Sequence, residues 1–362
     1  MKECCALLRH QTGERGKTEL MITVGFVGTG FIATAHSKRL RSAPPDLVHR
    51  GPVFDLDPDR AAAFAKVSGH TVATALDEVI ERCDAIFVTT WTSAHRSIVE
   101  QVVAAGKAVF CEKPLATCLQ DAQAMTNAVQ RSGVTAQSGL ILRHSPAWVY
   151  ARQLVQDPRA GRLMAVVFRD DQFIPTQGHY ASNWRADIDK VGGGTLLEHS
   201  VHDIDLIRWV GGDVVSIDAQ FSYFHGLPGI EDVATVSMRL ASGAHASLVS
   251  VWHDNLARPS QRHVEFICAR RVVTVSGDDY SGPVTWQDED GIVTSLQDDA
   301  LLDEALPLLE GQDNSTVAFV TAVAHGTAAY PSFGDALEAQ RLVHAAYDSA
   351  ERRSGPFSNS AR

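Results

Sequence analysis

The first strongly patterned stretch of the chain joins an apolar strand to a helix through a glycine-bearing turn. Residues 22–27 are Ile-Thr-Val-Gly-Phe-Val, and Gly28-Thr29-Gly30-Phe31-Ile32-Ala33 follow, with a helix expected over residues 31–40. In a G-x-G-x-x-A turn, Gly28 allows the tight bend, Gly30 lets the backbone approach a pyrophosphate, and Ala33 permits close helix–strand packing. The helix N-terminus favours a bound anion. The stretch therefore predicts a βαβ unit that binds a dinucleotide, with Gly28, Gly30, Phe31 and Ile32 against it.

The next predicted strand ends in a carboxylate whose charge affects the selectivity between NAD and NADP. Asp55 follows Val53-Phe54, 25 residues after Gly30. A carboxylate at this point accepts hydrogen bonds from ribose hydroxyls and repels a 2′-phosphate, so NAD is favoured over NADP. Asp57 precedes Pro58, an arrangement that predicts a helix cap.

Strands and helices continue to alternate up to about residue 140. The strand expected over residues 85–88 leads into a loop with Thr90, Trp91 and His95, and the strand over 108–110 leads into Cys111-Glu112-Lys113-Pro114. Ligands of open α/β sheets bind beyond the carboxyl ends of the strands. A partly desolvated lysine there can have a pKa low enough for proton exchange. Taken alone, the Glu-Lys pair also fits an ordinary surface pair beside a turn.

A second cluster of ionisable side chains follows Gly192-Gly193-Gly194. A helix is expected over residues 195–210, and Glu198, His202 and Asp205 fall at i, i+4 and i+7, on one stripe. Ionisable groups in an apolar helix are costly unless they are paired or functional. Three roles for these side chains remain open: acid/base catalysis or substrate binding, a structural hydrogen-bond network, and a metal site. The spacing supplies no third metal ligand, so no metal is predicted.

The predicted secondary structure changes after residue 214, where strands follow one another without intervening helices. This succession predicts an antiparallel sheet. Residues 286–304 are expected to form an edge strand and loops, and helices are expected over 315–325 and 336–351. The predicted organisation is a disordered extension (1–20), a doubly wound Rossmann domain (21–143), a second α/β domain (144–353) whose last helices can pack back on the first, and a tail (354–362).

Composition narrows the possible partners and compartment. A formal net charge of −11 and the lack of a basic, aromatic-studded segment argue against nucleic acid. No apolar run approaches the ~20 residues of a membrane span. The six cysteines show neither metal spacing nor a dense disulfide pattern, which favours reduced thiols and a cytoplasmic protein.

The order of these motifs resembles the glucose-fructose oxidoreductase / inositol dehydrogenase / rhizopine-catabolism (Gfo/Idh/MocA) oxidoreductase family. The resemblance spans about residues 21–353 and includes the Glu112-Lys113-Pro114 motif, Trp184-Arg185, the three glycines with Glu198 and His202, and the helix around Tyr347. It implies a Rossmann domain with a large, open, mostly antiparallel second sheet that often forms homo-dimer or homo-tetramer contacts. It also implies NAD-dependent hydride transfer to or from a secondary alcohol of a sugar, sugar derivative or cyclitol.

The resemblance assigns roles to named residues. Lys113 maps to the catalytic lysine, and Glu198 and His202 map to a later Asp/His pair, although Glu here replaces the commoner Asp. All three are expected to be catalytic, with either Lys113 or His202 moving the proton of the substrate hydroxyl. Thr90, Trp91, His95 and Glu112 are expected at the cofactor, and Arg143, Trp184, Arg185 and His199 at the substrate. Two rival functions remain: an NAD-using glycosidase of the same superfamily, and a non-catalytic NAD-binding sugar sensor.

Overall fold

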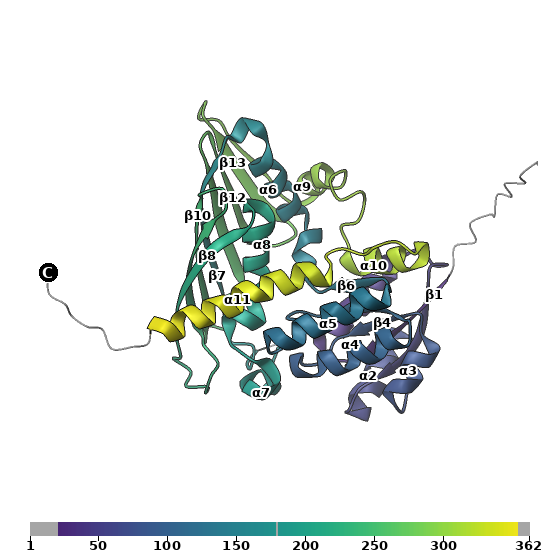
Figure 1. Ribbon diagram of the computed structural model, residues 1–362. Coiled ribbons are helices and arrows are strands. Elements are labelled where there is room, and N and C mark those ends of the chain that lie inside the picture. Colours follow the sequence, from purple (N-terminus) through teal and green to yellow (C-terminus); the bar gives the residue numbers. More distant parts are fainter. Residues whose placement is uncertain (1–20, 179, 354–362) are drawn as a thin grey trace, which may run out of the picture.

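The computed structural model describes residues 21–178 and 180–353, which form two units (Figure 1). The predicted disordered extension (1–20) and tail (354–362) lie outside the described residues. Within the described part, no helix is long and apolar enough to cross a membrane.

The first unit is a parallel sheet of six strands in the order β3-β2-β1-β4-β5-β6. Its strands are β1 Ile22–Val27, β2 Val48–Phe54, β3 Thr71–Val72, β4 Ala85–Val88, β5 Ala108–Cys111 and β6 Ala136–Ser138. Its helices are α1 Phe31–Arg39, α2 Pro58–Ser68, α3 Leu76–Arg82, α4 His95–Ala104 and α5 Leu119–Ser132. The strand order reverses between β1 and β4, and such a reversal opens a crevice at the carboxyl edge of the sheet. The predicted doubly wound fold is confirmed.

Local sequence explains how these elements begin and end. β4 and β5 are buried along their whole length, as expected of strands covered on both faces. Asp57 caps α2 as predicted, because its side chain accepts hydrogen bonds from the backbone N–H groups of Asp59 and Arg60. Gly69 ends the helix with a left-handed φ of 80°.

The second unit is a sheet of eight strands in the order β14-β13-β12-β11-β7-β10-β9-β8. β7 and β10 pair in parallel, whereas the other neighbours pair in antiparallel fashion. The strands are β7 Leu163–Phe173, β8 Val214–Ser222, β9 Val233–Leu240, β10 His245–His253, β11 Gln261–Cys268, β12 Arg271–Asp278, β13 Gly282–Asp288 and β14 Val293–Leu296. The prediction of a mostly antiparallel second sheet is therefore confirmed.

Helices cover one face of this sheet. α6 Pro146–Gln156, α8 Val201–Gly211 and α11 Phe333–Arg353 pack on it and share a continuous apolar core with it. The residues of β9 alternate between buried and exposed, so one side of each strand faces this core. Met164, Val167 and Val249 are exposed on the neighbouring strands β7 and β10.

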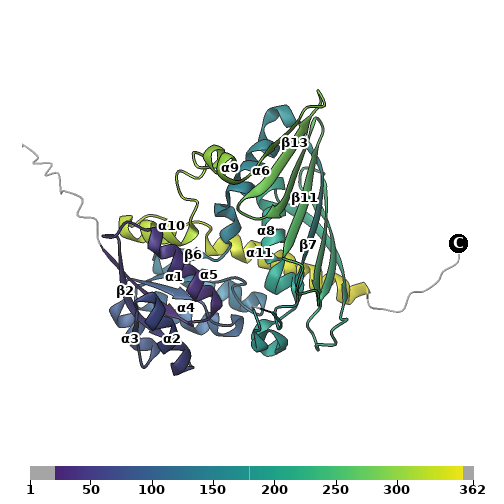
Figure 2. The same cartoon turned by 180° about the vertical axis from the view of Figure 1, so that it is seen from behind.

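The C-terminal helices return to the first unit. α10 Ser315–His325 lies beside α1 (Figure 2), and its Phe319 and Val320 belong to the same buried cluster as Phe26 of β1. α11 extends from α5 to the edge strand β8 (Figure 1). Chain segments far apart in sequence thus complete the packing of the dinucleotide unit.

Three local expectations differ from the structure. Residues 195–210 are not one regular helix but a π-helix, Thr195–His199, followed by α8. The segment 286–304 contains α9 Asp298–Ala305 besides strands. Residues 174–191 show no clear periodicity, which predicts a loop, but they contain α7 Ile188–Val191. Short helices held by tertiary contacts carry little periodic signal, which explains why sequence patterns miss them.

Candidate active site

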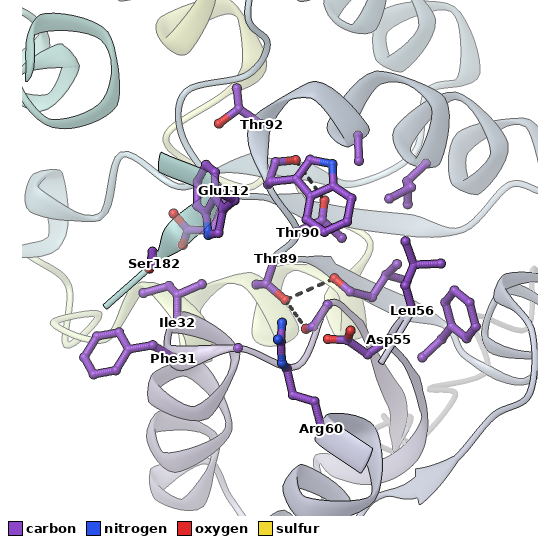
Figure 3. A pocket seen from close by; sticks show the side chains of 18 of the residues that line it. Phe31, Ile32, Asp55, Leu56, Arg60, Thr89, Thr90, Thr92, Glu112 and Ser182 are labelled. Atoms are coloured by element: carbon purple, nitrogen blue, oxygen red, sulfur yellow. Dashed lines mark hydrogen bonds between the residues drawn. The ribbon is translucent and has the colours of Figure 1, made fainter. Parts of the chain in front are cut away.

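A cavity of about 470 Å³ lies at the switch point of the parallel sheet (Figure 3). Its lining includes most of the residues predicted to contact the cofactor: Gly28, Gly30, Phe31, Ile32, Asp55, Thr90, Trp91, Glu112 and Lys113. Sequence patterns did not identify Arg60, Tyr180 or Ser182, which also line it. Tyr180 and Ser182 come from the second unit, so no motif of the first unit could signal them.

The two glycines of the first turn differ in their surroundings. Gly28 has a φ of +85°, and a Cβ there would lie 2.7 Å from the carbonyl oxygen of Thr89, so only glycine fits. A Cβ on Gly30 would meet nothing within 4 Å. The backbone at Gly30 is consequently open towards the cavity, as the approach of a pyrophosphate requires.

Asp55 borders the same cavity beyond the end of β2. Its carboxylate accepts hydrogen bonds from the backbone N–H of Thr29 at 2.8 Å and from the Thr29 hydroxyl at 3.0 Å. These bonds tie the acid to the glycine turn and fix its position at the rim. Arg60, whose guanidinium lies 3.5 Å from Asp57, also lines this cavity.

His95 does not line this cavity, contrary to the predicted cofactor contact. Its side chain is buried, with Nδ1 within 3.0 Å of the Pro114 carbonyl and Nε2 within 3.3 Å of the Thr90 carbonyl. Burial lowers the pKa of His95, so the imidazole stays neutral. His95 therefore lies between the two loops that line the cavity, donating its single N–H to one of them, instead of reaching into the cavity.

A second cavity of about 300 Å³ adjoins the first. Lys113, Tyr180 and Arg185 line both cavities, so Lys113 stands where the two meet. Its peptide bond to Pro114 is cis. Its ammonium donates to the backbone carbonyl of Glu198. Burial lowers the pKa of Lys113, although the negative charges of Glu198 and Glu112 act to raise it.

The π-helix explains how the Glu198 carbonyl becomes available to Lys113. The N–H of Ser200 bonds to the carbonyl of Thr195 at 2.8 Å, five residues back, which widens the turn and interrupts the regular bonding pattern. The Glu198 carboxylate points elsewhere: it accepts from the Thr92 hydroxyl at 2.8 Å and from Arg185 Nε at 3.3 Å. Glu198 thus connects the dinucleotide unit to the loop before α7.

His202 lines the second cavity with Glu198, whereas Asp205 does not share their surroundings. Burial and the charge of Lys113 lower the pKa of His202 well below its usual value, which leaves a neutral imidazole. Asp205 forms an ion pair with Arg143 at 2.5 Å, and both side chains are buried. Of the three residues in the predicted stripe, Glu198 and His202 therefore line the second cavity, whereas Asp205 belongs to a buried ion pair.

Arg143 accordingly does not lie in the wall of the substrate cavity, where it was predicted. Its guanidinium contacts Asp205 and Asp335 and lies over the Tyr330 ring, and it lines neither of the two cavities. The sequence-based expectation is corrected on this point, since a guanidinium held by two carboxylates is not directed at a ligand.

The other expected substrate residues do lie at the cavities. Arg185 stacks over Trp184 at 4.3 Å, and Trp184 lines the first cavity. His199 lines the second cavity, with Nε2 2.7 Å from Asp170 Oδ2. Burial and the neighbouring Arg262 lower the pKa of His199 to about 3.

Arg262 is a charged residue in the wall of the second cavity that sequence reasoning missed. It pairs with Asp203 at 2.7 Å, with Asp170 at 3.0 Å and with Asp279 at 2.5 Å. These carboxylates come from α8, β7 and the turn after β12; the register of β11 against β7 places Arg262 opposite Asp170. Among the described residues, no cluster of His, Cys, Asp or Glu has the geometry of a metal site.

Comparisons with known proteins agree with this geometry. A family model described as "Oxidoreductase family, NAD-binding Rossmann fold" matches residues 22–140, and the "GFO/IDH/MocA C-terminal domain" matches residues 148–274. The chain is 31% identical over 201 residues to a 1,5-anhydro-D-fructose reductase of Ensifer adhaerens, covering 54% of this chain and 58% of that protein. The chain therefore spans little more than half the length of this curated relative.

Two further matches extend over nearly the whole chain. An inositol 2-dehydrogenase of Rhizobium meliloti (strain 1021) is 27% identical over 360 residues, covering 92% of this chain and 98% of that protein. A levoglucosan dehydrogenase solved with NADH and levoglucosan superimposes with a TM-score of 0.82 at 20% identity, covering 92% of this chain and 98% of that chain. At this identity, the structural likeness shows a common fold.

Proposed function

The chain belongs to the GFO/IDH/MocA oxidoreductase family, and from this premise we propose that it transfers hydride between NAD and a secondary alcohol of a sugar, sugar derivative or cyclitol. One observation carries the proposal: Lys113 stands in the wall common to the dinucleotide cavity and to a second cavity lined by Glu198 and His202. A reacting carbon held at this junction has a hydride acceptor on one side and a proton acceptor on the other. Relatives named for inositol and levoglucosan support the substrate class.

The residues of the first cavity fit NAD. Gly30 leaves room for the pyrophosphate, and the carboxylate of Asp55 stands where ribose hydroxyls are expected. The charge of Asp55 disfavours an additional 2′-phosphate, so NAD is preferred to NADP. When bound, NAD supplies the hydride acceptor; the steps below belong to the protein.

In this mechanism Lys113 takes the proton of the substrate hydroxyl. Its lowered pKa makes the neutral amine available at a lower pH than for a free lysine, so alcohol oxidation should rise as the pH increases through this pKa. The neutral His202 orients the hydroxyl within the second cavity. Glu198 acts as a positioning residue, since its carbonyl holds Lys113 and its carboxylate holds Arg185.

A screen of inositols, sugars and sugar acids, followed as NADH formation across pH, tests the proposal. On the best substrate, Lys113→Met should lower kcat by roughly 10²–10⁴-fold, the usual contribution of general acid–base catalysis. Lys107→Met is the matched control, because Lys107 donates to the Cys83 carbonyl and lines neither cavity. His202→Asn should chiefly raise KM.

Three results would overturn the proposal. Undiminished turnover by Lys113→Met would remove the central role of that lysine. Cleavage of glycosides without net NADH formation would indicate the glycosidase instead. Tight NAD binding with no turnover of any polyol would indicate a sensor.

The same proposal extends to assembly and compartment. The exposed Met164, Val167 and Val249 on β7 and β10 fit a homo-dimer or homo-tetramer formed through the open sheet. Light scattering should give a mass above that of one chain, and Val167→Glu should reduce it. Cys83, Cys111, Cys118 and Cys268 are free thiols, which favours the reducing cytoplasm.

A further inference from the structure

A buried chain of three side chains ends at the dinucleotide cavity. His36 of α1 is fully buried; its Nε2 lies 2.8 Å from Glu112 Oε1, and its Nδ1 lies 2.7 Å from the hydroxyl of Thr316 in α10. Thr316 is fully buried as well, and Glu112 lines the cavity directly after β5. Residues 280 positions apart in the chain are thus joined behind one wall of the site.

The charge on Glu112 determines the direction of its hydrogen bond to His36. Burial acts to raise the pKa of Glu112, but the contacts with His36 and Lys113 together outweigh it, and the net pKa is lowered, so the acid is a carboxylate. A carboxylate only accepts, so Nε2 of His36 donates to Glu112, and Nδ1 forms a second hydrogen bond with the hydroxyl of Thr316. The His36 ring packs against Phe87 and Phe110, which keep it in place.

Other ionisable groups face Glu112 from its own segment and from α4. The backbone N–H of Lys113 donates to Oε2 at 3.2 Å, and the Lys113 ammonium also attracts the carboxylate. His95 of α4 is kept neutral by burial, and burial keeps the thiol of Cys111 protonated. Neither of these two neighbours neutralises Glu112.

Glu112 lies away from Asp55 in the cavity (Figure 3). With Asp55 at the adenosine ribose beyond β2, the nicotinamide end falls beyond β4 and β5, where Glu112 and Lys113 stand. The nicotinamide ring carries a positive charge in NAD⁺ and none in NADH. A fixed carboxylate at this end therefore interacts differently with the two oxidation states.

We propose that Thr316 and His36 are positioning residues that hold a negative charge on Glu112 at the nicotinamide end, and that this charge makes the site prefer NAD⁺ to NADH. The inference rests on the NAD site of the proposed function. A relative stabilisation of NAD⁺ favours the oxidation of the alcohol over the reverse reduction. The discrimination is a property of binding and exists without any sugar substrate.

The test compares the dissociation constants of NAD⁺ and NADH, measured by calorimetry without substrate. Glu112→Gln keeps the shape and removes the charge, so the ratio Kd(NAD⁺)/Kd(NADH) should rise by about tenfold, the scale of one partly screened charge. Thr316→Val removes only the hydroxyl that bonds Nδ1 of His36 and should raise the ratio by about two- to threefold, a share of one hydrogen bond.

His36→Phe adds a pH signature that a purely structural role would not produce. Without the His36 donor, only Lys113 opposes the effect of burial, so the pKa of Glu112 should rise. The ratio should then rise towards the Glu112→Gln value as pH is lowered from about 8 to about 5, whereas the wild-type ratio stays flat. His70→Phe is the matched control, since His70 is another buried histidine between phenylalanines of the same unit and lines neither cavity.

The outcomes separate this inference from the proposed function. An unchanged ratio in Glu112→Gln would overturn the inference while the NAD site stands. If wild-type protein binds neither nucleotide, the NAD site of the proposed function fails. If His36→Phe does not fold, Thr316→Val decides the role of the chain behind Glu112, and an unchanged ratio in that variant would refute it.

Discussion

Tyr347→Phe should loosen the helix that carries Glu198 and His202. The Tyr347 hydroxyl donates to Glu231 Oε1 at 2.9 Å, and the same carboxylate accepts from the backbone N–H groups of Gly194 at 2.7 Å and of Leu196 at 2.9 Å. Glu231 is 1% exposed. The carboxylate therefore binds the first N–H groups of the helical segment from within the protein.

The three glycines belong to the same arrangement. A Cβ on Gly194 would lie 1.9 Å from the carbonyl oxygen of Glu231, and a Cβ on Gly193 would lie 2.4 Å from the hydroxyl of Tyr347. A Cβ on Gly192 would lie 2.6 Å from Thr117, just beyond the Lys113–Pro114 bond. The glycines let this turn approach Glu231, α11 and the loop of the proposed catalytic lysine at once.

The expected effect of Tyr347→Phe follows from the bond that it removes. A hydrogen bond to a charged group contributes about 1.5–3 kcal/mol, so the free energy of unfolding should fall by about that amount. The ring contact with Phe221 is kept. The removed bond holds the carboxylate that binds the start of the helical segment with Glu198 and His202. For this reason kcat of the proposed oxidation should fall severalfold, while NAD affinity should stay the same.

Urea unfolding followed by tryptophan fluorescence, steady-state kinetics and NAD titration measure these three quantities. Tyr150→Phe is the control, since Tyr150 packs on Trp286 and lines neither cavity. Equal stability and equal kcat in the two variants would refute the reasoning. A loss of NAD affinity in Tyr347→Phe would show that the effect spreads beyond the helix.

Three further changes test other parts of the structure. Asp55→Asn should raise kcat/KM with NADP relative to NAD by about tenfold or more, measured with both cofactors, because one repelling charge is removed; an unchanged preference would contradict the assignment. Asp205→Asn breaks the buried pair with Arg143 and should lower the free energy of unfolding by about 3–5 kcal/mol, whereas Glu78→Gln, at an exposed pair, should leave it unchanged in urea titrations. Burial raises the pKa of Asp203 to about 7; the folded state then holds a proton that the unfolded state has lost, so stability should decline from about pH 4 to pH 7 by up to about 1.4 kcal/mol per unit. Asp203→Asn should flatten this decline, and an equal slope in both proteins would show that another group is responsible.

Much of the first unit could be predicted because its signals are local. A buried strand, the Gly28 turn and the N-terminus of α1 adjoin in the chain, so their contacts follow from short-range geometry. The cap at Asp57 is equally local. The same reasoning placed Glu112 and Lys113 at the carboxyl end of a parallel strand, where the structure has them.

The second cavity could be predicted only in part, because its geometry depends on a departure from helical regularity. An α-helix over residues 195–210 would align Glu198, His202 and Asp205, but the π-helix shifts the register before α8. The Glu198 carbonyl then meets Lys113, while Asp205, one turn beyond His202 in α8, meets Arg143. Periodicity does not reveal a single wide turn, since the same apolar positions satisfy both helices.

Local sequence thus determined the nucleotide fingerprint, the charge at its rim and the reactive side chains. Tertiary structure alone decided which partners they meet: His36 contacts Thr316 because α10 returns to α1, and Arg262 contacts Asp170 because β7 lies beside β11. The reason is physical. Backbone hydrogen bonding and burial periodicity act over a few residues, whereas the partner of a buried charge is set by which distant segments the whole core brings into contact.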